Sequence, residues 1–349
     1  MKALRPPGLH RVRIEGRLVW YDEAGRPVED AGELARLAEL AVPPAWREVW
    51  AAADPQAAVQ ATGVDARGRT QYRYLPAVLQ AHAEDKFGAL AAFGRALPSL
   101  RRTVADHVSE PLGDHPDRRP VLAAMTRLLD RGFFRVGSSR YLRDNHTYGL
   151  TTLRRDQVTI TGSVLHFDYV AKEHLHRITD VDDADSARVV VALLAMPGTP
   201  DQPLFRAATH PRPPGPVSSA TVNAYLHGLI GLPATAKAFR TWSGTVVAAA
   251  ARAGAVLPGL ATRASPDSPR VAVVSAAALL GNTPAVARTS YVHPAVLAGD
   301  PAPEVARAVD AVAEREGHRD LRLVWTDAGV QAAVAHQLEE VNTSSTPHG

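Results

Sequence analysis

The segment Gly132–Asn145 concentrates side chains that could bind a phosphate group. Arg135 follows two phenylalanines at the end of a helical pattern, and Arg140 and Arg143 lie on either side of Tyr141. A guanidinium group is a planar fork that can donate to two phosphate oxygens at once. The segment therefore indicates phosphate capture, with a surface loop in an arginine-rich chain as the alternative.

Lysine is scarce in this chain. Of its 39 basic residues 35 are arginine, and the four lysines are Lys2, Lys86, Lys172 and Lys237. A GC-rich genome that favours arginine codons would explain this bias. Arginine can replace lysine where only a positive charge is needed, but not where the side chain must give up a proton. We therefore single out Lys172 and Lys237, which lie near other residues capable of chemistry.

Each of these two lysines lies in a segment with a predicted secondary structure. Lys172 falls at the tip of a predicted β-hairpin, where a proton donor could reach into a groove; an ordinary turn lysine is the alternative. Lys237 and Arg240 are three residues apart, so a helix would present both on one face. The alternative there is an amphipathic helix whose aromatic residues enter the core.

Tyr291 follows a signal for a short helix. Thr283 and Pro284 form an N-cap and first-turn pair, and Pro294 predicts the end of the helix. Tyr291 would lie late in that helix. Considered alone, it is most simply a packing residue.

No metal or cofactor is expected. His174 and His176 alternate on a predicted strand without a third ligand, which argues against zinc. The sequence contains neither a glycine-rich phosphate loop followed by Lys-Ser/Thr nor a Gly-x-Ser-x-Gly elbow. The absence of cysteine excludes disulfides and thiolate ligands. ATP use therefore has no support in the sequence.

Length and composition predict about two globular domains. The chain has 349 residues, and 46% of them are hydrophobic, which is enough for a sizeable core. We see no signal peptide, and the longest apolar run, Val189–Met196, is far shorter than the ~20 residues that span a membrane. We expect a cytoplasmic protein without membrane contact. The pI near 9.3 is compatible with a polyanionic partner.

The first 80 residues have the pattern of a β-rich domain. Strands are predicted over 10–15, 17–21 and 67–74, and a helix over 31–40. In the last strand Arg67, Arg69, Gln71 and Arg73 would face one side, and Thr70, Tyr72 and Tyr74 the other.

From about Val78 the hydrophobic period becomes helical. Helices are predicted over 83–96, 101–109, 119–131, 187–194, 218–228, 246–253, 271–280 and 305–315. Strands over 158–160, 164–169 and 175–178 would form a small antiparallel sheet. Asp180–Asp185 is predicted to be a solvated loop. The domains would be 1–80 and 81–340, followed by a disordered tail over 341–349.

Five segments in order resemble the type IB DNA topoisomerases, especially the compact bacterial and poxvirus forms. In chain order they resemble the DNA-contacting strand of the amino-terminal domain, the first catalytic arginine segment, the catalytic lysine hairpin, the Lys-x-x-Arg-Thr helix and the nucleophile segment. They are Asp65–Tyr74, Phe133–Asn145 with Gly149 and Leu150, Tyr169–Glu173, Lys237–Thr241 and Gly281–Tyr291. The resemblance runs from about residue 10 to residue 300.

The resemblance implies an α+β fold and a bilobed clamp. A small antiparallel-β amino-terminal domain would be followed by a larger, mainly helical catalytic domain that carries a small β-hairpin sheet. The protein would act as a monomer around double-stranded DNA, associated with the nucleoid of a bacterium. It would relax supercoils through a 3′-phosphotyrosyl intermediate, without ATP or metal.

The resemblance also implies roles for single residues. Tyr291 would be the nucleophile, Arg135 and Arg240 would clamp the scissile phosphate, Asn282 would donate to a non-bridging oxygen, and Lys172 would protonate the leaving 5′-oxygen. Arg135 would assist this protonation. Further contacts to DNA would come from Arg67, Arg69, Gln71, Tyr72, Tyr74, Arg140, Tyr141 and Lys237.

Two departures and two rival functions accompany this interpretation. Members of the family commonly carry histidine where this chain has Asn282, and the poxvirus forms carry lysine where it has Ser138. A tyrosine recombinase or integrase uses a similar pocket, but usually has histidine at the place of Lys237. The second rival is a DNA-clamping protein without catalysis, which would need no tyrosine.

Overall fold

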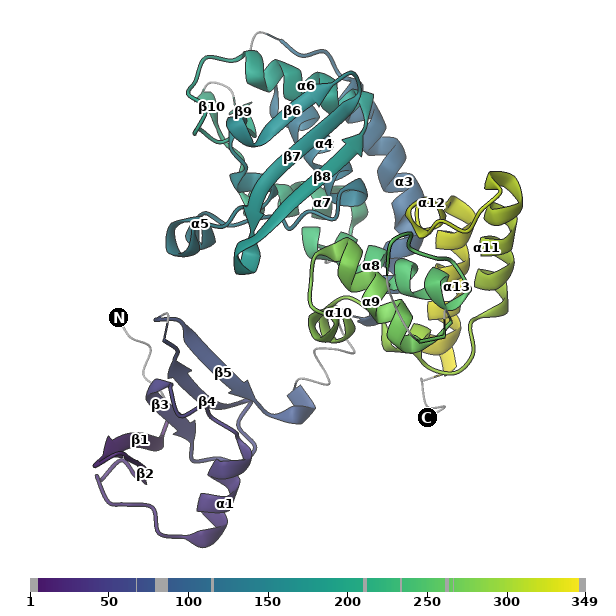
Figure 1. The fold of residues 1–349 in the computed structure, drawn as a ribbon. Coiled ribbons are helices and arrows are strands. Elements are labelled where there is room, and N and C mark those ends of the chain that lie inside the picture. Colours follow the sequence, from purple (N-terminus) through teal and green to yellow (C-terminus); the bar gives the residue numbers. More distant parts are fainter. Residues whose placement is uncertain are drawn as a thin grey trace. The chain divides into compact units, whose positions relative to one another are not determined.

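The computed structural model describes residues 6–66, 68–78, 87–113, 116–209, 212–232, 234–260, 264–265 and 267–344. The chain divides into two compact units, Met1–Phe87 and Gly88–Gly349. The expected α+β class is confirmed. The first unit is built on a small antiparallel sheet, and the second is mainly helical with small sheets (Figure 1).

The first unit is a five-stranded antiparallel sheet with a helix packed against it. The strand order is β2-β1-β3-β4-β5. The bounds are Gly8–Ile14 for β1, Arg17–Tyr21 for β2, Arg47–Ala52 for β3, Val59–Val64 for β4 and Thr70–Tyr74 for β5. Helix α1 (Ala31–Glu39) has Asp30 as its N-cap, whose carboxylate accepts from the Glu33 N–H. Its Leu37 joins a core with residues of β3 and β4.

Sequence patterns predict part of this sheet. The β1–β2 hairpin and α1 are confirmed, but β3 and β4 were not predicted. The last four residues of β3 are all buried, so no alternation of polar and apolar residues marks it. Strand β5 begins at Thr70, later than predicted, because the Asp65 carboxylate accepts from the Arg69 N–H at 3.0 Å and holds a turn before it.

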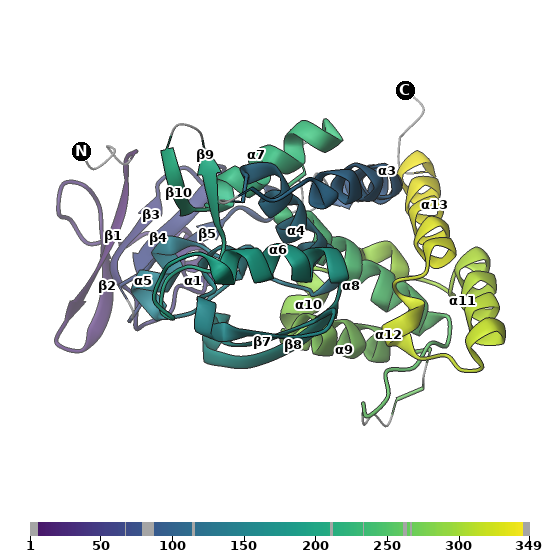
Figure 2. The same ribbon diagram turned by 90° about the horizontal axis from the view of Figure 1, so that it is seen from above.

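Helix α8 (Ala236–Arg252) is the centre of the second unit. Almost every residue of α8 is buried. The helices that contact it include α3 (Leu90–Ser109), α4 (Arg118–Arg131), α9 (Pro269–Leu280), α11 (Pro303–Glu316) and α13 (Ala328–Ser344) (Figures 1 and 2). A helix packed on all sides is a rigid support for functional side chains near its amino-terminal end.

Helix α3 corrects one expectation. The sequence predicted a break between 96 and 101, but α3 continues through Pro98. Leu97 and Leu100 on either side of the proline are at most 4% exposed. Burial of these side chains outweighs the loss of one backbone hydrogen bond at Pro98. Residues 83–86 of the expected helix lie outside the described part of the chain.

The small sheet carries the lysine hairpin. Strands β6 (Val158–Thr161), β7 (Val164–Ala171) and β8 (Leu175–Asp182) pair antiparallel in that order, as expected. The turn between β6 and β7 contains Gly162 with a positive φ of 62°. A single 3₁₀ turn, η3 (Lys172–His174), joins β7 to β8 and forms the hairpin tip.

The prediction of a solvated loop over Asp180–Asp185 is wrong. Strand β8 extends through Asp182, and α6 (Ala184–Ala195) begins two residues later. Between them Asp183 is only 4% exposed. Its carboxylate accepts from the Arg127 Nε at 2.7 Å and from the Ser186 hydroxyl at 2.7 Å. This buried pairing turns one member of an acidic run inward.

Several further elements were not predicted. They are α5 (Ser139–Asn145), the hairpin of β9 (Arg206–Thr209) and β10 (Arg212–Pro216), α12 (Leu321–Val324) and α13. Helix α7 (Ser219–Ile230) lies where a helix was expected. The tail was predicted to be disordered from 341, but α13 continues through Ser344, and 345–349 lie outside the described residues.

Within the described residues no single helix has the length and apolar composition to cross a membrane. Only α9 together with α10 (Pro284–Ser290) would pass such a test, and that pair is bent by 96°.

Candidate active site

Tyr291 lies at the end of the short helix that the sequence predicted. The Thr283 hydroxyl accepts from the Val286 N–H at the start of α10, and Tyr291 forms its C-cap. The Tyr291 carbonyl accepts from the Thr245 hydroxyl of α8 at 3.3 Å. A Cβ on Gly244 would lie 2.7 Å from that carbonyl oxygen, so the glycine permits this close approach. The backbone of Tyr291 is therefore held directly against the central helix.

Arg240 enters from α8 and is 2% exposed. Its guanidinium donates to the carbonyls of Phe133 and Leu280, the latter at 2.9 Å. The guanidinium carbon lies 4.9 Å from the centroid of the Tyr291 ring. Its Nε is buried and has no hydrogen-bond partner among the described residues. A cation and a phenol therefore meet in a site with little solvent.

Arg135 lies in the segment between α4 and α5. The carbonyls of Arg135 and Val136 accept from the N–H groups of Leu150 and Thr151, both at 2.8 Å. This contact requires glycine at Gly149, because a Cβ there would lie 2.8 Å from the Arg135 carbonyl oxygen. The fold therefore fixes the backbone from which the Arg135 side chain extends.

Asn282 is paired with Arg135. The Arg135 Nη2 donates to the Asn282 side-chain oxygen and, at 3.2 Å, to the Gly281 carbonyl. The amide nitrogen Nδ2 of Asn282 is buried and has no hydrogen-bond partner among the described residues. A buried donor without a partner costs free energy unless a ligand supplies an acceptor.

Lys172 lies at the hairpin tip, in a turn whose next two residues, Glu173 and His174, have positive φ angles of 69° and 57°. Its Nζ is 6.0 Å from the ring centroid of Tyr141, which extends from α5 and is 45% exposed. Figure 1 shows α5 beside this end of the β7–β8 hairpin. Lys172 is exposed, so its ammonium group is accessible to a ligand.

One cavity of about 290 Å³ brings most of these side chains together. Four of the five predicted catalytic residues line it, and they come from four separate elements or segments: Arg135, Lys172, Arg240 and Tyr291. The wall also contains Ser138, Tyr141 and Lys237. Asn282 joins the set through its bond to Arg135 and is not part of the wall. Arg140 is exposed on α5, 3.6 Å from Asp144.

The electrostatics of the cavity favour a phenolate. Burial alone raises the pKa of Tyr291, but the combined attraction of Arg240, Arg135 and Lys237 exceeds this effect and lowers it below 10.0. The Arg240 hydrogen bond to the phenol acts in the same direction. Burial, followed by the charge of Arg135, lowers the pKa of Arg240. The cavity is therefore suited to negative charge on a ligand and on the tyrosine.

Arg177 of β8 was not predicted. Its Nη2 donates to the Leu279 carbonyl at 2.8 Å, and it is hydrogen-bonded to the Tyr169 hydroxyl. Burial raises the pKa of Tyr169, while Arg177 and the two cavity arginines oppose the change. The sequence contains one signal that could have identified Arg177, because Tyr169 and Arg177 are cross-strand partners in the hairpin.

Of the candidate DNA contacts of the first unit, Gln71 lies on one face of β5, Tyr72 and Tyr74 lie on the other, and Arg69 lies just before the strand. Arg69 and Gln71 both bond to the Asp65 carboxylate, at 2.7 and 2.8 Å. Tyr72 and Tyr74 are 49% and 38% exposed on the other side, and their rings stack with centroids 5.8 Å apart. Both tyrosine rings are therefore accessible to a ligand. Arg67 lies outside the described residues.

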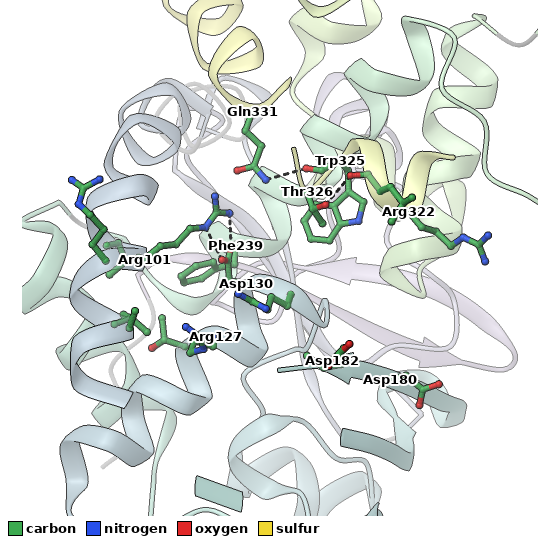
Figure 3. A pocket seen from close by; sticks show the side chains of 18 residues that line it. Arg101, Arg127, Asp130, Asp180, Asp182, Phe239, Arg322, Trp325, Thr326 and Gln331 are labelled. Atoms are coloured by element: carbon green, nitrogen blue, oxygen red, sulfur yellow. Dashed lines mark hydrogen bonds and ion pairs between the residues drawn. The ribbon is translucent and has the colours of Figure 1, made fainter. Parts of the chain in front are cut away.

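A larger cavity of about 940 Å³ contains none of the predicted site residues (Figure 3). Its polar wall includes Arg101, which pairs with Asp130 at 2.7 Å, and Arg127, which pairs with Asp183 at 2.5 Å. The charges of these arginines are therefore already balanced within the protein.

One surface cluster could bind a metal ion by its residue types. Glu304 of α11 and His336 and Glu340 of α13 bring possible ligand atoms within 4.8 Å of one another. The side chains of His336 and Glu340 are 57% and 62% exposed. Exposed acidic groups often cluster without an ion, and none of the three residues lines the cavity that contains Tyr291.

Two family models match the chain. The one described as "Eukaryotic DNA topoisomerase I, catalytic core" matches residues 77–298, and the one described as "Bacterial DNA topoisomerase IB, N-terminal domain" matches residues 17–65. The first range contains all five predicted catalytic positions.

A similar protein is "DNA topoisomerase 1B" of Acanthamoeba polyphaga mimivirus, 29% identical over 165 residues. These residues cover 47% of this chain and 48% of the viral protein, so the chain matches about half the length of this relative.

Proposed function

We propose that this chain, which belongs to the type IB DNA topoisomerase family, relaxes supercoiled DNA by cutting and resealing one strand. The observation that carries the proposal is the single cavity lined by Tyr291, Arg240, Arg135 and Lys172. A nucleophile, two phosphate donors and a proton donor are the groups that transfer of a phosphodiester to a hydroxyl requires.

The nucleophile of the proposed reaction is the Tyr291 phenolate. Its oxygen attacks the scissile phosphorus, a new P–O bond forms to the tyrosine, and the bond to the 5′-oxygen breaks. The product is a 3′-phosphotyrosyl link and a free 5′ end. The guanidinium of Arg240 beside the ring supports this step, because it favours loss of the phenolic proton.

Charge that develops on the non-bridging oxygens is stabilised by Arg240, Arg135 and Asn282. Two of these three residues have a donor that is not yet used. The Arg240 Nε and the Asn282 Nδ2 are both buried and without partners among the described residues. Preorganised donors of this kind are each worth roughly 3–4 kcal/mol, or 100–1,000-fold in rate.

Lys172 supplies the proton that the 5′-oxygen needs as it leaves, with assistance from Arg135. In resealing, the free 5′-hydroxyl attacks the phosphotyrosyl bond, Lys172 takes its proton back, and Tyr291 leaves. The tyrosyl phosphodiester has nearly the free energy of the bond that it replaces. Resealing in this scheme therefore needs neither ATP nor a metal.

The proposed partner is double-stranded DNA, bound by a single copy of the chain in the bacterial cytoplasm. The Tyr72–Tyr74 face of the first unit and the cavity of the second would both contact the duplex. The free 5′ end would swivel while the strand is open. Affinity should fall steeply with salt, because phosphate contacts would dominate binding.

Relaxation of a supercoiled plasmid tests this function directly. Wild-type protein should relax the plasmid in EDTA without nucleotide, and Tyr291→Phe should bind the plasmid without relaxing it. An absolute need for ATP or Mg²⁺, or normal relaxation by Tyr291→Phe, would contradict the proposal.

A further inference from the structure

Three consecutive carbonyls at the end of α9 accept hydrogen bonds from three arginines. The Leu279 carbonyl accepts from Arg177 at 2.8 Å, the Leu280 carbonyl from Arg240 at 2.9 Å, and the Gly281 carbonyl from Arg135 at 3.2 Å. The arginines come from β8, from α8 and from the segment after α4. The end of one helix thus gathers guanidinium groups from three separate parts of the unit.

The carboxyl end of a helix is suited to this task. Its last carbonyls have no partners within the helix and carry the negative end of the helix dipole. The three guanidinium groups repel one another, and the charge of Arg135 disfavours the charged form of both Arg177 and Arg240. The α9 carbonyls offset this repulsion before any phosphate is bound.

Arg177 differs from the other two arginines in its position. It does not line the cavity that Arg135, Arg240 and Tyr291 share. It is part of β8, where it is the cross-strand partner of Tyr169 and is bonded to the Tyr169 hydroxyl. Arg177 therefore joins the hairpin sheet to α9 from behind the cavity.

Gly281, the C-cap of α9, shows how closely Arg177 packs against the end of this helix. Its φ of +61° favours glycine, and an added Cβ would lie 2.3 Å from the Arg177 Nη1. The next residue is Asn282, and Thr283 then caps α10, whose C-cap residue is Tyr291. A shift of Arg177 would therefore move Gly281 and the adjacent Asn282, which both accept hydrogen bonds from Arg135.

We propose that Arg177 is a positioning residue for the reaction, one that fixes the end of α9 so that Arg135, Arg240 and Asn282 are aimed at the scissile phosphate. This inference rests on the proposed function. Arg177 has no contact with DNA in this scheme. It acts through the Leu279 carbonyl and its packing against Gly281.

The test compares Arg177→Met with a matched control, Arg188→Met. Arg188 donates to the carbonyls of Val108 and Glu110 at the end of α3, so it binds a helix end in the same way but without contact with the cavity residues. The measurement is the single-turnover rate of covalent adduct formation on a duplex oligonucleotide at saturating protein, together with the DNA dissociation constant and the melting temperature of each variant.

Two substrates separate positioning from general damage. One has an ordinary scissile phosphate, and the other has a methyl group in place of one non-bridging oxygen, which removes the negative charge. Misplaced donors should slow Arg177→Met by about 100-fold on the ordinary substrate. The defect should shrink on the neutral substrate, because less charge needs the donors. Binding of DNA should be unchanged, and Arg177→Lys should recover part of the rate because its ammonium can still donate to the Leu279 carbonyl.

The outcomes are distinct. If wild-type protein forms no adduct, the proposed function fails. If it does, then a normal rate for Arg177→Met, an equal defect on both substrates, or the same defect in Arg188→Met would overturn the role of Arg177. If Arg177→Met does not fold, Arg177→Lys and Tyr169→Phe provide the same comparison, and a lack of substrate dependence in both would overturn it.

Discussion

The guanidinium carbon of Arg240 lies 4.9 Å from the centroid of the Tyr291 ring, and each group changes the acidity of the other. Arg240 is almost fully buried on the central helix, and the backbone of Tyr291 is bonded to that same helix through Thr245. The proposed nucleophile and phosphate donor are therefore held as one rigid pair. Their spacing does not depend on a mobile loop.

This pairing predicts how cleavage depends on pH. Because the cavity lowers the pKa of Tyr291, the single-turnover cleavage rate at saturating DNA should rise with pH to a plateau. The pH at which the rate is half-maximal should lie below 10.0. Lys237→Met removes one of the charges that lower this pKa, so its midpoint should move upward. Arg140→Met is the matched control, since Arg140 is exposed and outside the cavity wall. An unchanged or lower midpoint in Lys237→Met would refute the assignment.

The role of Lys172 can be isolated by changing the leaving group. Lys172→Ala should slow cleavage by about 10²–10⁴-fold, because the 5′-oxygen then leaves without its proton. A substrate with sulfur in place of that oxygen needs no such proton and should restore most of the rate. Arg135→Ala serves as the comparison and should be rescued far less. Equal rescue of both variants would remove Lys172 as the acid.

Asn282 is one of the two positions at which this chain departs from the family pattern, and its buried Nδ2 leads to a definite prediction. Asn282→Ala should slow cleavage by roughly 100-fold or more at unchanged DNA affinity, since a donor to the non-bridging oxygen is lost. Asn282→His restores a donor and should recover much of the rate. The comparison requires rates measured under single turnover. A rate for Asn282→Ala equal to that of wild type would show that the amide does not contact the phosphate.

The chemistry of the site was largely predictable because few residue types can perform it. Lysine scarcity pointed to Lys172, and the Thr283–Pro284 cap correctly predicted a short helix, although Tyr291 is the C-cap of this helix and not part of its last turn. The resemblance joined these segments into one set, and the cavity contains four of its five catalytic members. The roles of these residues stay predictions until tested by mutation.

Arg177 and Asp183 show what the sequence could not reveal. Arg177 looked like one arginine among 35, and its importance arises from a strand register and a helix end 102 residues away. Asp183 belongs to an acidic run that favours solvent, yet a partner on α4 turns it inward. Long-range pairing of this kind leaves little local pattern, so neither residue was predicted.

Mapping the covalent adduct tests the central claim most directly. Wild-type protein is mixed with a duplex oligonucleotide that loses its 5′-hydroxyl piece after cleavage, so the adduct cannot reseal, and the digested complex is sequenced by mass spectrometry. We predict a nucleotide on the tryptic peptide 289–307, attached through its 3′-phosphate to Tyr291. Attachment to any other residue, or the absence of an adduct from protein that binds the duplex, would contradict the account.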